Sequence, residues 1–214
     1  MKSSIDSAKE RERIVEMLSY ERELWNSGNK YVAGVDEAGR GPLAGPVVAA
    51  AVIFPDDVYI EGVDDSKRLS ALRREQLYSI IIKRALSVAT GIVDEREIDR
   101  INILQASLKA MRMAVGRLSV RPDHLLIDGI CLPEKFYPQT PIKGGDTKCF
   151  SIAAASIVAK VTRDRIMIEY DRVFPQYGFA RHKGYGTRAH VEAIRRHGPC
   201  RIHRRSFKMD GWKR

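Results

Sequence analysis

Two adjacent carboxylates, Asp36 and Glu37, follow directly on a short apolar run with the composition of a β-strand. Neighbouring residues on a strand point to opposite faces, so both acids can reach one ligand only if the chain bends beside them. Gly39 and Gly41 supply that freedom, and glycine also lets backbone N–H groups approach a ligand closely. An isolated Asp-Glu pair is usually a solvated turn, but this glycine-rich setting makes the pair a candidate metal site.

Two further acids have the same character. Asp128 ends the apolar run that starts at His124, and Asp146 follows two glycines. Taken alone, Asp128 would cap a turn and Asp146 would be an acid favoured by a helix N-terminus. Taken with Asp36 and Glu37, they form a set of four oxygen donors, the kind of ligand that hard divalent cations prefer.

A glycine loop, a lysine and a tyrosine are candidates for binding a substrate. The loop Gly39-Arg40-Gly41 lacks the Gly-Lys-Ser/Thr ending of a P-loop, so it does not indicate a nucleoside triphosphatase. Tyr185 lies between two glycines, where an exposed ring can stack on a sugar or a base. Lys67 can contact a phosphate, and the alternatives for these features are a tight turn and a solvated lysine.

Two basic residues farther along the chain are weaker candidates. Lys160 and Arg163 lie in a long helical pattern rich in small residues. Arg163 is followed at once by Asp164, so a structural ion pair is the alternative to substrate binding.

The strands and helices that must position these residues are predicted from the periodicity of apolar residues and from the glycine, proline and capping residues between them. Continuous apolar runs predict strands, and stripes spaced by threes and fours predict helices. Ser70 is a plausible N-cap for one of these helices. The predicted strands cover residues 31–36, 47–54, 86–93, 122–128 and 140–143. The predicted helices cover residues 4–27, a segment after Ser70, about 101–118, 151–173 and 188–197.

The order of these elements predicts an α/β domain with a mixed five-stranded sheet flanked by helices. The first two strands are joined by a short loop and should pair antiparallel. A right-handed crossover would place the fourth strand beside the first. Asp36 and Asp128 would then face one crevice at the carboxyl ends of neighbouring strands, where ligands bind in such sheets.

Length and composition point to one domain, with or without a small appendage, and to an anionic partner. The chain has 214 residues, 44% of them hydrophobic, and a net charge of +10. No apolar run is long enough to cross a membrane and no secretory signal is visible, so a cytoplasmic location is expected. Three unpatterned cysteines fit reduced thiols better than disulfides or a zinc site.

Charge is unevenly distributed along the chain. Residues 181–214 contain eleven Lys and Arg against two acids, which is nine of the ten net positive charges. Tyr185, Phe207 and Trp212 are interleaved with them, as in a nucleic-acid-binding surface. We expect residues 1–30 to form an accessory N-terminal helix, and residues 31–214 to form the catalytic domain with a basic C-terminal helical segment.

Five motifs in order resemble those of the type 2 ribonuclease H family, the bacterial ribonucleases HII. The resemblance covers residues 31–207, nearly the whole chain. The motifs are the run VDEAGRGPLAGPVVAAAV from Val35, Asp65-Ser66-Lys67, Ile127-Asp128-Gly129, Gly145-Asp146 with the helix Ser151 to Lys160, and HKGYGT from His182.

This resemblance implies a ribonuclease H-like fold and an activity. The chain would be a monomeric endonuclease that cuts the RNA strand of RNA–DNA hybrids and incises 5′ of ribonucleotides embedded in duplex DNA, leaving 5′-phosphate and 3′-hydroxyl ends. Asp36, Glu37, Asp128 and Asp146 would be catalytic and hold two Mg²⁺ or Mn²⁺ ions. Binding of substrate would fall to five residues, some through the backbone: Gly39, Arg40, Gly41, Lys67 and Tyr185.

Within this scheme the Gly-Arg-Gly loop would sense the ribose 2′-hydroxyl, and Tyr185 would pack on the deoxyribose that follows the ribonucleotide. Two alternatives stay open. One is another metal-dependent phosphoryl transferase of this fold that acts on DNA, such as a resolvase. The other is a non-catalytic RNA-binding module, which would bind without metal-dependent cleavage.

Overall fold

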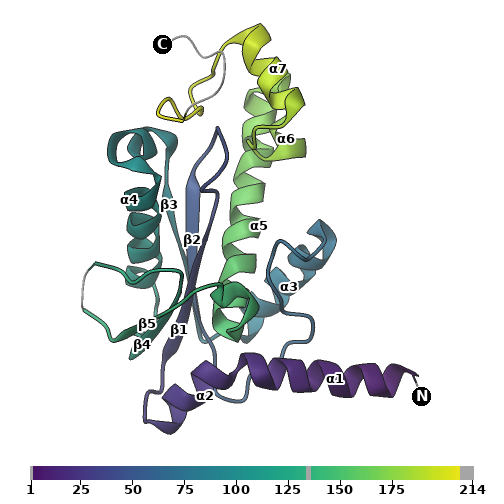
Figure 1. Cartoon of the computed structure of the whole chain (residues 1–214), viewed down its shortest axis with the longest axis vertical. Coiled ribbons are helices and arrows are strands. Elements are labelled where there is room, and N and C mark those ends of the chain that lie inside the picture. Colours follow the sequence, from purple (N-terminus) through teal and green to yellow (C-terminus); the bar gives the residue numbers. More distant parts are fainter. Residues whose placement is uncertain (1, 134–135, 208–214) are drawn as a thin grey trace.

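The computed structural model describes residues 2–133 and 136–207, which form one sheet with helices on both faces (Figure 1). Lys208, Asp210, Trp212, Lys213 and Arg214 of the basic end lie outside these residues. The strands are β1 (Val32–Ala38), β2 (Val47–Ile53), β3 (Ser87–Val93), β4 (His124–Asp128) and β5 (Gln139–Ile142). The longer helices are α1 (Lys2–Met17), α2 (Ser19–Asn26), α3 (Ala71–Arg84), α4 (Glu95–Gly116), α5 (Phe150–Val173) and α7 (Arg188–His197). Short turns of helix are η1 (Gly145–Thr147), η2 (Pro175–Tyr177) and α6 (Phe179–His182).

The sheet has the strand order β3-β2-β1-β4-β5. β1 pairs antiparallel with β2 and parallel with β4, with Val35 opposite Ile127. The predicted mixed five-stranded sheet and the placing of the fourth strand beside the first are therefore confirmed. The register puts Asp36 and Asp128, each one residue further on, at the same end of neighbouring strands.

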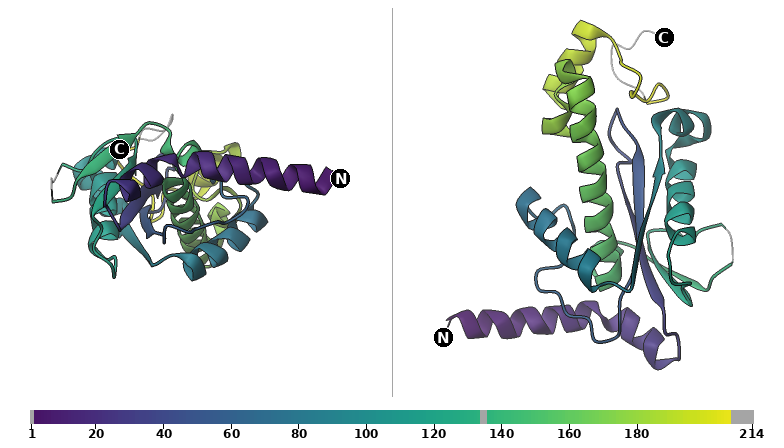
Figure 2. Two further views of the ribbon diagram at one scale, coloured as in Figure 1. Left: turned by 90° about the horizontal axis from the view of Figure 1, so that it is seen from below. Right: turned by 180° about the vertical axis from the view of Figure 1, so that it is seen from behind.

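β2 is buried along its whole length because helices cover both faces of the sheet (Figure 2). Ala50 and Val52 pack in a cluster with α1, α3 and α5, whereas Ala49 and Ala51 pack in a cluster with α4. Alternation of side chains across a strand sends successive residues to these two opposite layers. A continuously apolar run is the sequence of such a strand.

Small residues let α5 lie close to the centre of the sheet. Ala153, Ala154 and Ala155 are fully buried near the start of the helix. On the facing strand, a Cβ added at Gly34 of β1 would overlap the backbone of Ser151. This close contact fixes the start of α5 beside the strand that carries Asp36.

The N-terminal region forms two helices and not the single helix expected over residues 4–27. The helix is interrupted at Leu18, which lies between the end of α1 and the start of α2. Ile14 and Leu18 are buried against the core. Glu21 of α2 is also buried, and its Oε1 accepts hydrogen bonds from the Ser151 N–H at 2.7 Å and the Ser151 hydroxyl at 2.6 Å. α2 thus supplies a carboxylate to the first turn of α5, where Ser151 lacks an intrahelical partner. The domain boundary near residue 30 stays a prediction.

Beyond the sheet, α5 continues into α6 and α7, which form a separate small cluster around Tyr177 and Phe179 (Figure 1). α7 begins at the N-cap Thr187, whose side chain accepts from the His190 N–H. Its bounds agree with the predicted helix over residues 188–197. No helix in the described part of the chain is long and apolar enough to cross a membrane.

Candidate active site

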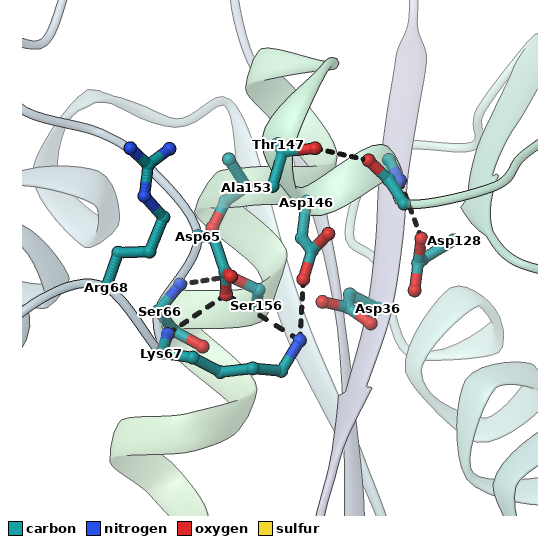
Figure 3. A network of polar contacts seen from close by, with 12 residues as sticks. Asp36, Asp65, Ser66, Lys67, Arg68, Asp128, Asp146, Thr147, Ala153 and Ser156 are labelled. Atoms are coloured by element: carbon teal, nitrogen blue, oxygen red, sulfur yellow. Dashed lines mark hydrogen bonds and ion pairs between the residues drawn. The ribbon is translucent and has the colours of Figure 1, made fainter.

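Three separate elements bring the four candidate acids to one end of the sheet. Asp36 and Glu37 lie in the last part of β1, Asp128 ends β4, and Asp146 lies in η1. Asp36 and Asp146 are 4% and 5% exposed. Figure 3 shows the carboxylates of Asp36, Asp128 and Asp146 gathered around one space.

Backbone hydrogen bonds hold this arrangement. Asp128 Oδ1 accepts a hydrogen bond from the Gly145 N–H at 2.7 Å, which ties η1, and with it Asp146, to the end of β4. Asp36 Oδ1 accepts from the Glu37 N–H at 2.7 Å. Each of these two aspartates therefore uses one oxygen to order the backbone and keeps the other for a ligand.

The acids repel one another because they are crowded away from water. Burial, followed by the charges of Glu37 and Asp128, raises the pKa of Asp36 well above its usual value. Burial is also the main cause that raises the pKa of Glu37 and of Asp128. A cation placed among these groups would relieve both the desolvation and the repulsion.

Lys67 already provides one positive charge at the edge of the cluster (Figure 3). Its Nζ lies 2.7 Å from Asp146 Oδ2 and 3.7 Å from Asp65 Oδ1. Partial burial opposes the charged form of Lys67, but the hydrogen bond and the charge of Asp146 outweigh it and raise the lysine pKa. The Lys67 side chain is 77% exposed, so its ammonium group can also contact a ligand from solvent.

The donor chemistry of the cluster fits a hard divalent cation, since all its ligand atoms are carboxylate oxygens. In the described residues no three His, Cys, Asp or Glu side chains are close enough together to form a ready-made metal site. The acids are thus a donor set that a cation would draw together. The residues that could hold it are Asp36, Glu37, Asp128 and Asp146.

The candidate substrate residues lie beside this cluster. Gly39 has φ +99°, a conformation that favours glycine, and Arg40 Nη1 lies 3.3 Å from Glu37 Oε1. The ring of Tyr185 is 43% exposed and lies against Gly41, where an added Cβ would be 3.8 Å from the ring Cε1. The structure therefore brings the loop and the tyrosine together.

A model of the Ribonuclease HII family matches residues 33–210, more than half of the chain. The chain belongs to the ribonuclease HII family. A ribonuclease HII of Acetivibrio thermocellus is 57% identical over 206 residues, which cover 96% of this chain and 80% of that protein. A ribonuclease HII of Geobacter metallireducens is 60% identical, covering 88% of this chain and 92% of that protein. The resemblance inferred from the motifs is thereby confirmed.

Solved structures agree with family membership. The ribonuclease H2 of Pyrococcus horikoshii is 30% identical and superposes with a TM-score of 0.69, covering 83% of this chain and 94% of that one. A Bst ribonuclease HIII solved in complex with Mn²⁺ superposes with a TM-score of 0.56 at 19% identity, covering 80% of this chain and 64% of that one. The latter likeness is one of fold alone. Together they confirm the ribonuclease H-like α/β architecture.

Two features at the site differ from the sequence interpretation. Arg163 forms no ion pair with Asp164 in the described part of the chain. The Asp164 carboxylate instead pairs with Lys160, whose Nζ lies 2.8 Å from Asp164 Oδ1, and Arg163 is buried beneath the glycine loop. Arg204, which sequence reasoning counted only as part of the basic end, is also buried there, with 0% exposure. No signal in the sequence separates Arg204 from its exposed neighbour Arg205.

Proposed function

We propose that this chain is an endonuclease that hydrolyses the RNA strand of RNA–DNA hybrids and cuts duplex DNA on the 5′ side of an embedded ribonucleotide. The observation that carries the proposal is the meeting of Asp36, Asp128 and Asp146 from three elements, next to a glycine loop and an exposed tyrosine. Membership of the ribonuclease HII family supports the same activity.

Asp36, Glu37, Asp128 and Asp146 are proposed to hold two divalent cations, Mg²⁺ or Mn²⁺. Such cations, when bound, supply the charge that activates a water molecule and stabilises the leaving 3′ oxygen. The all-oxygen donor set and the raised pKa values of Asp36, Glu37 and Asp128 support this role. Lys67, held at the edge of the cluster by Asp146, is proposed to bind a substrate phosphate.

Recognition of the ribonucleotide is proposed to reside in Gly39, Arg40, Gly41 and Tyr185. A protein distinguishes RNA from DNA at a given position by the 2′-hydroxyl, which both donates and accepts hydrogen bonds. The backbone of the loop would bind this hydroxyl, and Tyr185 would pack on the neighbouring sugar. The contact between Gly41 and the Tyr185 ring supports a single recognition surface.

The substrate's own 2′-hydroxyl is not the proposed attacking group. That reaction needs an acid and a base, typically histidines, and leaves a 2′,3′-cyclic phosphate. All five histidines lie in the described residues, and none of them hydrogen bonds with the four acids. Water as the nucleophile predicts 5′-phosphate and 3′-hydroxyl ends.

The proposed setting is a monomer in the cytoplasm that acts on nucleic acid. Cys131, Cys149 and Cys200 are free thiols, which fits a reducing compartment. The partner is proposed to be an RNA–DNA hybrid or a ribonucleotide-containing duplex, as the net charge of +10 favours a polyanion.

The test is cleavage of a labelled DNA duplex that contains one ribonucleotide, alongside the all-DNA duplex and an RNA–DNA hybrid. We expect cutting of the two ribonucleotide-containing substrates with Mg²⁺ or Mn²⁺, none in EDTA, and fragments whose masses show 5′-phosphate ends. A cyclic phosphate, or cutting in EDTA, would overturn the two-metal mechanism. Binding without cleavage would favour the RNA-binding alternative, and cutting of DNA junctions alone would favour the resolvase alternative.

A further inference from the structure

Two arginines are buried beneath the glycine loop with no carboxylate partner in the described part of the chain. Arg163 of α5 is 1% exposed and Arg204 of the C-terminal segment is 0% exposed. All six of their hydrogen bonds end on backbone carbonyl oxygens, at distances between 2.6 and 3.1 Å. Arg163 donates to Ala44, Pro46 and Lys183, and Arg204 donates to Gly39, Arg40 and Gly45.

Burying two guanidinium groups without an anion is costly unless their donors are satisfied. Burial lowers the pKa of Arg163 to about 10 and that of Arg204 to about 9, so both stay charged at neutral pH. The groups that accept their hydrogen bonds are peptide carbonyls in residues 39–46 and at Lys183, while the charges of Asp164, Asp99 and Glu95 act on them without direct contact. The arrangement therefore orients one short loop with two fixed positive charges.

The orientation of these carbonyls decides where the loop N–H groups point. In a trans peptide the C=O and the following N–H point in opposite directions. Because Arg204 binds the carbonyls of Gly39 and Arg40, the N–H groups of Arg40 and Gly41 face away from the protein interior. Neither N–H group has an acceptor among the described residues, and a guanidinium on the carbonyl side strengthens each as a donor.

Arg163 also sets the position of Tyr185. Arg163 binds the carbonyl of Lys183, two residues before Tyr185, and its Cζ lies 5.9 Å from the centre of the tyrosine ring. The glycine loop and the tyrosine loop are joined directly by a 2.8 Å hydrogen bond from the Leu43 N–H to the Gly184 carbonyl. A Cβ at Gly39 would overlap the Arg163 side chain, so the arginine also explains this glycine.

We infer that Arg163 and Arg204 are positioning residues for ribonucleotide recognition, which hold the Arg40 and Gly41 N–H groups and the Tyr185 ring in one fixed arrangement. The inference rests on the proposed function of the loop. On this inference, two buried residues help to distinguish RNA from DNA because they order the loop that contacts the ribonucleotide.

The variant Arg204→Lys tests this, because it keeps the charge and removes the fork of donors. The matched control is Arg84→Lys, the same change at an exposed position at the end of α3, away from the site. Dissociation constants are measured in Ca²⁺ for a DNA duplex with one ribonucleotide and for the all-DNA duplex of the same sequence. We expect Arg204→Lys to lower the ratio of the two affinities by about tenfold or more, and Arg84→Lys to leave the ratio unchanged.

The ratio separates positioning from mere folding, because a loss of folded protein lowers both affinities equally. If the wild-type chain does not discriminate between the duplexes, the proposed function fails. If it discriminates and folded Arg204→Lys keeps the wild-type ratio, the inference alone is overturned.

The inference can also be decided on the wild-type chain should the buried variant not fold. With ¹⁵N-labelled protein, the amide signals of Arg40 and Gly41 should shift on adding the ribonucleotide duplex and not on adding the all-DNA duplex. Unchanged signals with the ribonucleotide duplex, in a chain that binds it, would overturn the inference.

Discussion

At the scale of single residues, the site contains acids whose surroundings oppose their ionised form and one lysine that partly compensates. Asp36 and Asp128 each order a backbone N–H group with one oxygen, and burial raises the pKa of both. Such a cluster is stable enough to form yet remains short of positive charge. This imbalance is what one expects of a site that takes up cations to work.

We predict that Asp128→Asn keeps the fold and abolishes cleavage. The amide oxygen of Asn can still accept from the Gly145 N–H, so η1 stays in place, while the charge that would hold a cation is lost. Loss of a carboxylate with a raised pKa should leave the melting temperature unchanged or higher. Turnover near that of the wild type at saturating Mg²⁺ would remove Asp128 from the site.

Tyr185→Ala should weaken cleavage of single embedded ribonucleotides more than cleavage of long hybrids. Stacking of an aromatic ring is worth about 1–3 kcal/mol, and a single ribonucleotide has fewer other contacts to replace it. The ring is 43% exposed, so we expect little change in the free energy of unfolding. Tyr59→Ala, at a tyrosine that is 38% exposed, is the control. An equal loss on both substrates and on all-DNA binding would indicate general misfolding instead.

At the scale of elements, the segment around α6 and α7 is tied together by a chain of hydrogen bonds through two buried histidines. The Cys200 N–H donates to His203 Nδ1 at 2.9 Å, so His203 must donate from Nε2 to His190 Nε2 at 3.1 Å. His190 Nδ1 then donates to the Tyr185 carbonyl at 2.9 Å. Both histidines are neutral in this arrangement, and it reaches the backbone of the candidate substrate tyrosine.

This pair predicts a loss of stability in acid. Burial is the main cause that lowers the pKa of His190 and of His203 to about 4, against 6.5 in the unfolded chain. The unfolded state therefore binds more protons between these values, and stability present above pH 6.5 is lost as the pH falls toward 4. The expected slope is about 1.4 kcal/mol per pH unit for each histidine.

Urea unfolding at several pH values measures this effect. Because the raised pKa values of the crowded acids affect stability with the opposite sign, the wild-type chain is compared with His190→Gln, which cannot take up a proton at that position. The variant should show a shallower loss between pH 6.5 and 4, whereas His197→Gln, at an exposed histidine, should not. Identical slopes for the wild type and His190→Gln would contradict the prediction.

At the scale of the whole molecule, the described part of the basic segment, residues 181–207, lies toward the end of the sheet that contains the acids. α7 and residues 198–207 extend beyond the point where β1 is followed by the glycine loop (Figure 1). Residues 181–214 contain nine of the ten net charges. An anionic duplex would thus be attracted to the end of the molecule that contains the candidate site.

Affinity for an RNA–DNA hybrid should therefore fall steeply with salt, and the exposed arginines of α7 should contribute to the slope. For the double variant Arg195→Gln, Arg196→Gln we expect the slope of log affinity against log salt to fall by about two. The control is Lys83→Gln, Arg84→Gln at the end of α3, near the opposite end of the sheet. An unchanged slope in the α7 variant would show that the duplex binds elsewhere.

The sequence by itself determined most of the elements and most residues of the candidate site. Local preferences and the burial of apolar faces can be recognised in short stretches of sequence. They predicted the strands with continuous apolar runs, the N-cap at Ser70 and the helix over residues 188–197. The acids could be predicted because strand ends meet at one edge of a sheet, and the motifs were long enough to indicate the family.

Only the tertiary structure decided which charges are buried and what they hold. Arg204 and Arg205 are adjacent and alike in sequence, yet one is fully buried and binds carbonyls more than 150 residues away. Arg163 binds the same loop instead of Asp164, and Glu21 reaches α5 from a helix expected to be only accessory. The cost of burying a charge depends on partners from distant segments, and no local preference of the chain contains that information.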